Sequence, residues 1–126
     1  MTLETKIWYG EFDERYEASF VEGKLHGKLS CWSNPFDPEQ KEYEQEYEYG
    51  VLNGKTIGWD DIGNVAFEGF YKDGLKHGCW LQFLENGQLA SEEHYHLGVL
   101  DGRSREWDDD GSLIATFHYK EGKKQD

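Results

Sequence analysis

The stretch at residues 71–95, YKDGLKHGCWLQFLENGQLASEEHY, decides the fold, because the chain on both sides repeats its pattern of glycines and aromatic residues. Four series of residues recur with a common step of 24 positions. The series are Gly50, Gly74, Gly98 and Gly122; Gly54, Gly78 and Gly102; Gly63, Gly87 and Gly111; and Tyr47, Tyr71, Tyr95 and Tyr119. A fixed period of this length is typical of repeat proteins in which each copy is one supersecondary unit.

The repeat continues towards the N-terminus in a modified form. An earlier copy carries Phe20, Gly23, Gly27 and Trp32, and its step to the next copy is 27 residues. The three extra residues lie within 33–40, SNPFDPEQ, which holds both prolines of the chain. We therefore expect a single repeat domain divided into a half copy (1–19), four copies (20–46, 47–70, 71–94 and 95–118) and a partial copy (119–126).

Each copy predicts two short antiparallel strands. A six- or seven-residue run follows the second glycine, and a turn dipeptide such as Asn86-Gly87 or Asp110-Gly111 then favours the positive φ values of a tight hairpin turn. No segment has helical periodicity, so the sequence predicts an all-β, elongated antiparallel meander of stacked β-hairpins. A mean hydropathy of -0.89 indicates a thin sheet, whose burial depends on aromatic residues at 16% of the chain.

The period of two along each strand predicts which side of the sheet is buried. The side expected to be mostly buried carries Val65, Phe67, Gly69 and Tyr71; Leu89, Ser91, Glu93 and Tyr95; and Leu113, Ala115, Phe117 and Tyr119. The side expected to meet solvent carries Ala66, Glu68 and Phe70; Ala90, Glu92 and His94; and Ile114, Thr116 and His118. The two cysteines, Cys31 and Cys79, lie in different copies and are expected to be free buried thiols.

The charge balance restricts the class of partner. Thirteen lysine and arginine residues against 26 aspartate and glutamate residues give a formal net charge of -13. This charge disfavours direct binding to nucleic acid and to anionic membranes, and it favours a cationic protein partner. The N-terminal residues do not resemble a signal peptide and no apolar run reaches the length of a membrane span, so the expected location is the cytoplasm.

Acidic residues recur in register with the repeat. Glu17, Glu44, Glu68 and Glu92 each lie three positions before a closing aromatic residue, which predicts a row of carboxylates about 9.5 Å apart on the solvent side. Two interpretations stay open, an acidic contact surface and ordinary solvated or edge-protecting residues. The residues that the first interpretation assigns to partner binding, including three aromatics expected to be exposed, are Glu17, Glu42, Glu44, Glu46, Glu48, Glu68, Glu92, Trp59, Phe70 and Trp107.

Other clusters of polar residues are weaker signals. Acidic residues 108–110 are attributed to their turn. His94 and His96 form an H-x-H pair with Glu92 nearby, but a metal site needs three or four converging ligands, so no metal or cofactor is expected. No serine lies in a nucleophile motif, neither cysteine is next to a histidine in the sequence, and no phosphate loop occurs. We therefore expect no catalytic residues and no enzyme activity.

The segments YKDGLKHGCW, ENGQLASEEHY and HYKEGKK resemble the MORN-repeat variant found in the YwqK-type antitoxin family of bacteria. The resemblance covers residues 20–126 and is closest at 71–124, although the tryptophan two positions after the second glycine occurs only at Trp80. It implies a stack of hairpins and an antitoxin or immunity role, in which the chain occludes the active site of a basic toxin. The alternative is a scaffolding repeat protein that self-associates or organises an assembly.

Overall fold

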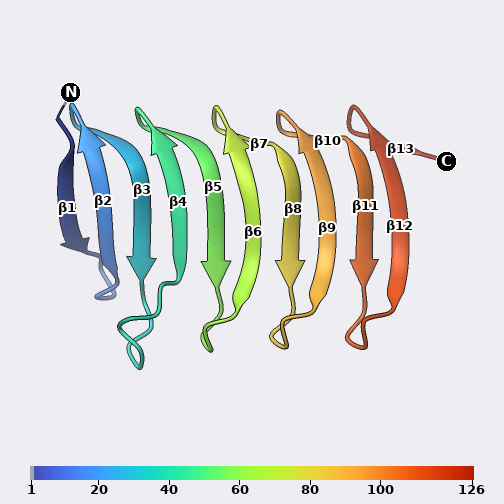
Figure 1. Cartoon of the computed structure of the whole chain (residues 1–126), viewed down its shortest axis with the longest axis horizontal. Helices are drawn as coiled ribbons and strands as arrows, with labels where there is room; N and C mark the ends of the chain where they lie inside the picture. The colour runs from blue at the N-terminus through green and yellow to red at the C-terminus, as the bar shows by residue number, and fades with distance from the viewer. Residues whose placement is uncertain (1) are drawn as a thin grey trace.

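The computed structural model describes residues 2–126, and in this range it contains one 13-stranded antiparallel sheet and no helix (Figure 1). The predicted all-β meander of hairpins is confirmed. Without helices, residues 2–126 offer no helical membrane span. The strands are β1 (Glu4–Tyr9), β2 (Arg15–Val21), β3 (Lys24–Trp32), β4 (Tyr43–Glu48), β5 (Val51–Trp59), β6 (Val65–Lys72), β7 (Leu75–Lys76), β8 (Gly78–Phe83), β9 (Leu89–His96), β10 (Val99–Leu100), β11 (Gly102–Trp107), β12 (Leu113–Lys120) and β13 (Lys123–Gln125).

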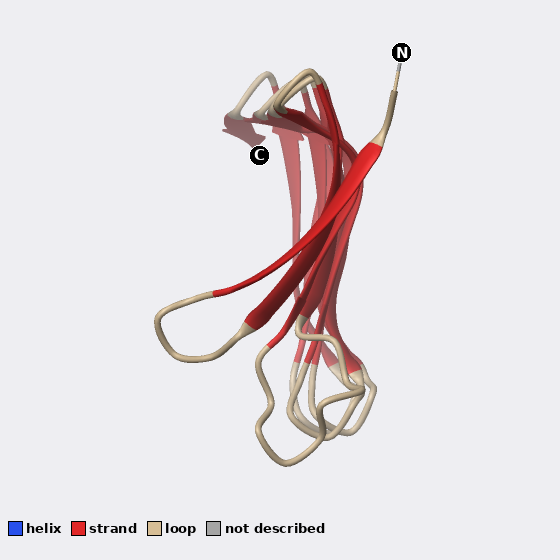
Figure 2. Cartoon of the chain, turned by 90° about the vertical axis from the view of Figure 1, so that its left-hand side faces the viewer, coloured by secondary structure: helices blue, strands red, loops and turns tan. Residues whose placement is uncertain are grey.

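The strands follow one another across the sheet in the order of the sequence. The short strands β7 and β10 are each separated by one residue from β8 and β11, and they pair with β6 and β9. Figures 1 and 2 show a single bowed layer with β1 at one edge and the C-terminal strands at the other. Every contact between strands therefore joins segments that are close in sequence.

The two ends of the sheet have different kinds of turn. At the upper end in Figure 1, two-residue turns place both central residues at positive φ, as at Asp73 (51°) and Gly74 (84°), which is the type I′ geometry. At the lower end the connections are longer. Gly87 donates its N–H to the Leu84 carbonyl (2.9 Å) and Leu84 donates to Gln88 (2.8 Å), which gives a type I turn followed by a glycine bulge. The predicted positive φ applies to Gly87, and Asn86 does not adopt it. We call these the short-turn end and the long-loop end.

Hydrogen bonds at the short-turn end tie each copy to the previous one. The turn glycines Gly50, Gly74, Gly98 and Gly122 donate their N–H groups to carbonyls of the preceding copy at 2.7–2.8 Å. Two histidines add to these bonds, because the Nδ1 atoms of His26 and His77 accept the N–H groups of Tyr49 (3.2 Å) and Leu97 (3.1 Å). These histidines thus have a structural role in fixing the turns.

Strict alternation fails where strands leave the long loops. The register shifts between Gly58 and Trp59, so that Phe67 lies opposite Gly58 while Val65 lies opposite Trp59. Equivalent shifts place Leu89 opposite Phe83 and Leu113 opposite Trp107. The prediction that Val65, Leu89 and Leu113 share the buried face is wrong. A β-bulge places them on the same side of the sheet as their pairing partners Trp59, Phe83 and Trp107, which is the side opposite Phe67. Leu113 is 52% exposed.

The sheet buries aromatic rings against its own small residues. We call the side that carries Phe67, Trp80 and Tyr95 the aromatic face. Trp80 packs edge-on against Tyr71 and Tyr95, with ring centroids 5.1 and 6.4 Å away. A Cβ at Gly69 would overlap the Trp80 indole, so glycine is needed to let this ring lie on the strand. The thin core expected from the hydropathy is thus made of rings on backbone.

The two cysteines differ in environment. Both are free thiols; Cys31 is buried, but Cys79 is exposed. The prediction of two buried thiols is wrong for Cys79, which lies on the face opposite Trp80 and is exposed.

We predict that Gly69→Ala lowers the free energy of unfolding by about 1–3 kcal/mol, because the new methyl group must displace a rigid indole. Gly10→Ala is the matched control. Neither glycine has a positive φ, and the three atoms nearest to a Cβ added at Gly10 all belong to the flexible carboxylate of Glu14. Urea unfolding measures both variants, and equal losses of stability would contradict the packing role of Gly69.

Candidate functional site

The predicted carboxylate row lies on the face opposite the aromatic face. Strand pairing carries the row across the sheet through Glu17, Ser30, Glu44, Ile57, Glu68, Leu81, Glu92 and Arg105. Paired residues in a sheet share one face, so the four glutamates point to the same side on alternate strands. We call this side the carboxylate face.

The row is not the open anionic strip that the alternation predicted. Glu44 forms an ion pair with Lys41 (2.9 Å) and lies 4.0 Å from Lys28, and its side chain is only 15% exposed. Glu92 is buried, at 9% exposure. Within residues 2–126 no ion pair engages Glu17 or Glu68. Half of the row is therefore neutralised within the sheet.

Glu92 is the centre of the densest polar cluster. Arg105 donates from Nε to Oε1 (3.1 Å) and from Nη2 to Oε2 (2.9 Å), and Arg103 Nε and His94 Nε2 each lie 3.5 Å from Oε1. The bidentate bond from Arg105 is the main reason that the pKa of Glu92 is lowered. The sequence reasoning missed both arginines because they lie in the next copy, and only the β9–β11 register brings them to Glu92.

The remaining predicted acidic residues are dispersed. Glu46 lines a shallow hollow on the carboxylate face with Lys28 and Lys55. Glu42 does not share this face, because it precedes β4 and its carboxylate lies 3.8 Å from the Cys31 thiol. Glu48 is near the short-turn end, where Asn53 donates to it at 2.6 Å.

The predicted aromatic contacts are covered to different extents. Phe70 is 43% exposed. Trp59 and Trp107 are only half-buried, and the Arg105 guanidinium lies 4.9 Å from the Trp107 ring centroid. Of the three aromatics expected on the surface, only Phe70 is exposed.

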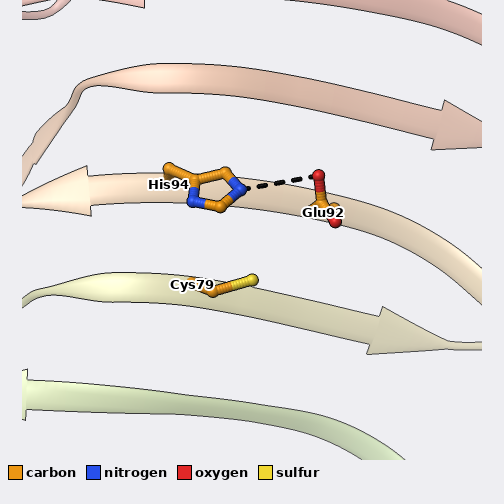
Figure 3. A group of neighbouring side chains, drawn as sticks. All are labelled: Cys79, Glu92 and His94. Atoms are coloured by element: carbon orange, nitrogen blue, oxygen red, sulfur yellow. Dashed lines mark ion pairs between the residues drawn. The ribbon is translucent and has the colours of Figure 1, made fainter.

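Cys79, Glu92 and His94 form a group of metal-ligating types, with ligand atoms within 4.8 Å of one another (Figure 3). Cys79 lies opposite His94 in the β8–β9 pair, a contact that the sequence did not indicate. The chemistry opposes a cation, however. Arg105 and Arg103 occupy the Glu92 carboxylate. Although Cys79 is exposed as a residue, partial desolvation of its sulfur, followed by the charges of Glu92 and Glu68, raises the pKa of the thiol. His96 packs on His77, with ring centroids 5.2 Å apart, and is outside the group. The arrangement fits an ion-pair network better than a metal centre.

Most of the net charge lies at the long-loop end. Five loops, 10–14, 33–42, 60–64, 84–88 and 108–112, contain 12 of the 26 acidic residues and one lysine, a net of -11 from the total of -13. The acidic residues are Glu11, Asp13, Glu14, Asp37, Glu39, Glu42, Asp60, Asp61, Glu85, Asp108, Asp109 and Asp110. Antiparallel hairpins place all five loops at the same end of the sheet, the long-loop end (Figure 1). We call this row of five loops the acidic edge, and it is the main electrostatic feature of the molecule.

The acidic edge is not visible in the sequence when the charges of each turn are considered separately. Asp108 does have the local role assigned to it, since its Oδ1 accepts the N–H groups of Asp110 (3.1 Å) and Ser112 (3.0 Å). Asp60 bonds Ile62 and Asn64 in the same way. The signal that could have revealed the edge was the sum of charges at one end of every predicted hairpin.

We predict that Glu92→Gln lowers the free energy of unfolding at pH 7 by about 1–2 kcal/mol, because Arg105 loses its charged acceptor. The folded pKa of Glu92 lies below its ordinary value of 4.5, so ionised Glu92 stabilises the fold above pH 4.5, and this contribution is lost as the pH falls through the folded pKa. The difference between wild type and variant should therefore shrink in acid.

Glu68→Gln is the matched control, because it removes the same charge from the same face without breaking an ion pair. Thermal or urea unfolding between pH 3 and pH 7 measures all three proteins. A difference for Glu92→Gln that stayed constant over this pH range would show that its carboxylate is not selectively stabilised.

Comparison with known proteins agrees with the repeat structure. Residues 76–96 and 100–121 match the family described as MORN repeat variant. Each matched segment begins on a short strand and contains one hairpin, β8–β9 or β11–β12, and the two starts are 24 residues apart. No curated protein matches the chain. The two C-terminal hairpins are thus similar to MORN repeats of the variant type, a repeat class that suggests a protein-binding or structural module.

Proposed function

We propose that this chain is a non-enzymatic protein-binding module that neutralises a cationic protein, in the manner of an antitoxin or immunity protein acting in the cytoplasm. The observation that carries the proposal is the net charge of -11 on the five loops of the long-loop end. Such a concentration of one sign attracts a basic surface over several ångströms and accelerates encounter. The partner is therefore a protein with a basic groove or patch.

The acidic loops are held in a fixed arrangement. In four of the five loops a backbone hydrogen bond joins the first and last residues, as between Asp108 and Ser112 at 2.9 Å, and in the 33–42 loop Glu42 donates its N–H to the Cys31 carbonyl at 2.7 Å. The middle three loops are also linked to one another, because Asn34 Nδ2 donates to the Asp61 carbonyl (3.3 Å) and Asn64 Nδ2 to the Glu85 carbonyl (2.7 Å). Little conformational entropy is then lost when a partner binds, which favours affinity.

The spacing of the loops suits an extended basic surface. Successive long loops leave the sheet two strands apart, about 9.5 Å, which is close to the screening length of about 8 Å at physiological salt. The potentials of adjacent loops therefore overlap, and their mutual repulsion is relieved when a cationic partner lies along the edge. The substrate of such a partner could then no longer reach the partner's basic active site. This occlusion is how the chain would neutralise a toxin.

A scaffolding role is the second candidate, and the open edges of the sheet favour it. All six residues of β1 are exposed, and its outer side has no strand partner within residues 2–126. At the opposite edge β13 pairs only with residues 118–120 of β12. Unpaired strand edges can pair with another chain, so this candidate predicts self-association.

We predict that reversing three loop charges, with Asp61→Lys, Glu85→Lys and Asp109→Lys combined, abolishes capture of basic proteins from the native host. No hydrogen bond or ion pair engages these three side chains within residues 2–126, so the reversal changes the field without removing a structural contact. The readout is quantitative mass spectrometry of proteins captured at low and high salt.

The control is the triple variant Glu4→Lys, Glu106→Lys and Asp126→Lys, which changes the net charge equally but lies outside the long loops. It should still capture the partner. Equal loss in both variants would show that overall charge, and not the acidic edge, attracts basic proteins. Capture that is unaffected by salt and by either variant would contradict the proposal that the partner is a cationic protein.

The two candidates also differ in their hydrodynamic behaviour. The binding module is expected to sediment as a monomer of 14.7 kDa at all protein concentrations, because its acidic copies repel one another. Sedimentation velocity over a hundredfold range of concentration tests this expectation. Concentration-dependent oligomers at both low and high salt would favour the scaffold.

A further inference from the structure

Three exposed apolar side chains stand on the acidic edge. Phe12 is 85% exposed, Phe36 is 95% exposed and Ile62 is 71% exposed, and they lie on the first three long loops. The corresponding positions in the last two loops are the polar residues Asn86 and Asp110. Apolar tips are therefore confined to the N-terminal half of the edge, which differs in chemistry from the rest.

Each apolar tip is fixed by its own loop. Side chains accept the backbone N–H of all three residues: Glu14 Oε2 from Phe12 (2.9 Å), Asn34 Oδ1 from Phe36 (2.9 Å), and Asp60 Oδ1 from Ile62 (3.1 Å). The side chains thus project into solvent from closed loops. Exposed apolar groups rimmed by polar residues are typical of protein interaction sites.

A cleft of about 330 Å³ separates the first two of these loops. Its walls come from Tyr9, Phe12 and Asp13 on one side and from residues 33–35 and Pro38 on the other. In Figure 2 the β1–β2 loop projects away from the remaining long loops. The three-residue insertion of the sequence lies in the second wall, so the cleft exists where the repeat departs from its regular length.

The floor of the cleft carries an unpaired donor. Arg15 and Trp32 form this floor, with the guanidinium 4.2 Å from the ring centroid. Arg15 Nε is buried and has no hydrogen-bond partner within residues 2–126. A buried donor without an acceptor is unfavourable, and a small movement of the Arg15 side chain that exposes Nε to the cleft would let an entering acceptor bond to it. A backbone carbonyl of a bound polypeptide supplies such an acceptor.

We propose that this cleft and the three apolar tips are the docking surface for an extended segment of a basic protein, in which apolar side chains alternate with lysine or arginine. The inference rests on the proposed function and names the part of the partner that is bound. An apolar side chain enters the cleft against Phe12, and its neighbouring cations pair with Asp13, Asp37 and Glu39. Charge complementarity excludes a second copy of this chain, whose loops carry the same sign.

Two fluorescent peptides of equal charge test the docking surface. One contains six lysines and three phenylalanines, and the other has serine in place of each phenylalanine. We expect wild-type protein to bind the phenylalanine peptide at least tenfold more tightly by fluorescence anisotropy. The double variant Phe12→Ala, Phe36→Ala should reduce this affinity to that of the serine peptide, while binding of the serine peptide stays unchanged.

The control is the double variant Leu113→Ala, Ile114→Ala, which removes apolar side chains of 52% and 60% exposure from β12. It should bind both peptides like the wild type, and circular dichroism checks that all proteins are folded. Equal binding of the two peptides by wild-type protein would overturn the docking surface and leave the cationic-partner proposal standing. Failure to bind either peptide at low salt would overturn both.

Discussion

The packing of aromatic rings onto the backbone of a single sheet is the constraint on which the rest of the structure depends. No second layer covers the sheet in residues 2–126, so rings such as Trp80 obtain burial from glycine on the neighbouring strand and from other rings along the row. A ring then needs a small residue beneath it, as Trp80 has in Gly69 and Phe67 has in Gly58. Stacking of the copies extends this packing along the sheet.

The same constraint makes the two ends of the sheet chemically different. Type I′ turns with positive φ at both residues, and bonds between copies, fix the short-turn end. The long loops close on themselves with local bonds, so their outward side chains are free to vary. Twelve acidic residues and three exposed apolar residues occupy this end, whereas on the carboxylate face Glu44 and Glu92 are paired within the sheet. Binding of the partner protein is therefore assigned to the long-loop end of the sheet.

The period and turn dipeptides were enough to predict the meander, because every strand pairs with a sequence neighbour. The predicted faces were wrong at Val65, Leu89 and Leu113, since the bulge that follows each of the last three long loops is not visible in simple alternation. The glutamate row could be aligned from the repeat, but its neutralisation depends on Arg105, which only the register between copies brings to Glu92. The acidic edge needed the charges of separate turns to be added together in space.

The central claim is that the negative potential of the molecule is concentrated at the long-loop end. Paramagnetic relaxation of amide protons by a cationic and an anionic nitroxide measures the potential near each residue directly. The account predicts strong preference for the cationic probe at residues 10–14, 33–42, 60–64, 84–88 and 108–112, and a much weaker preference at the short turns around Gly50, Gly74 and Gly98. The same preference at both ends of the sheet would contradict it.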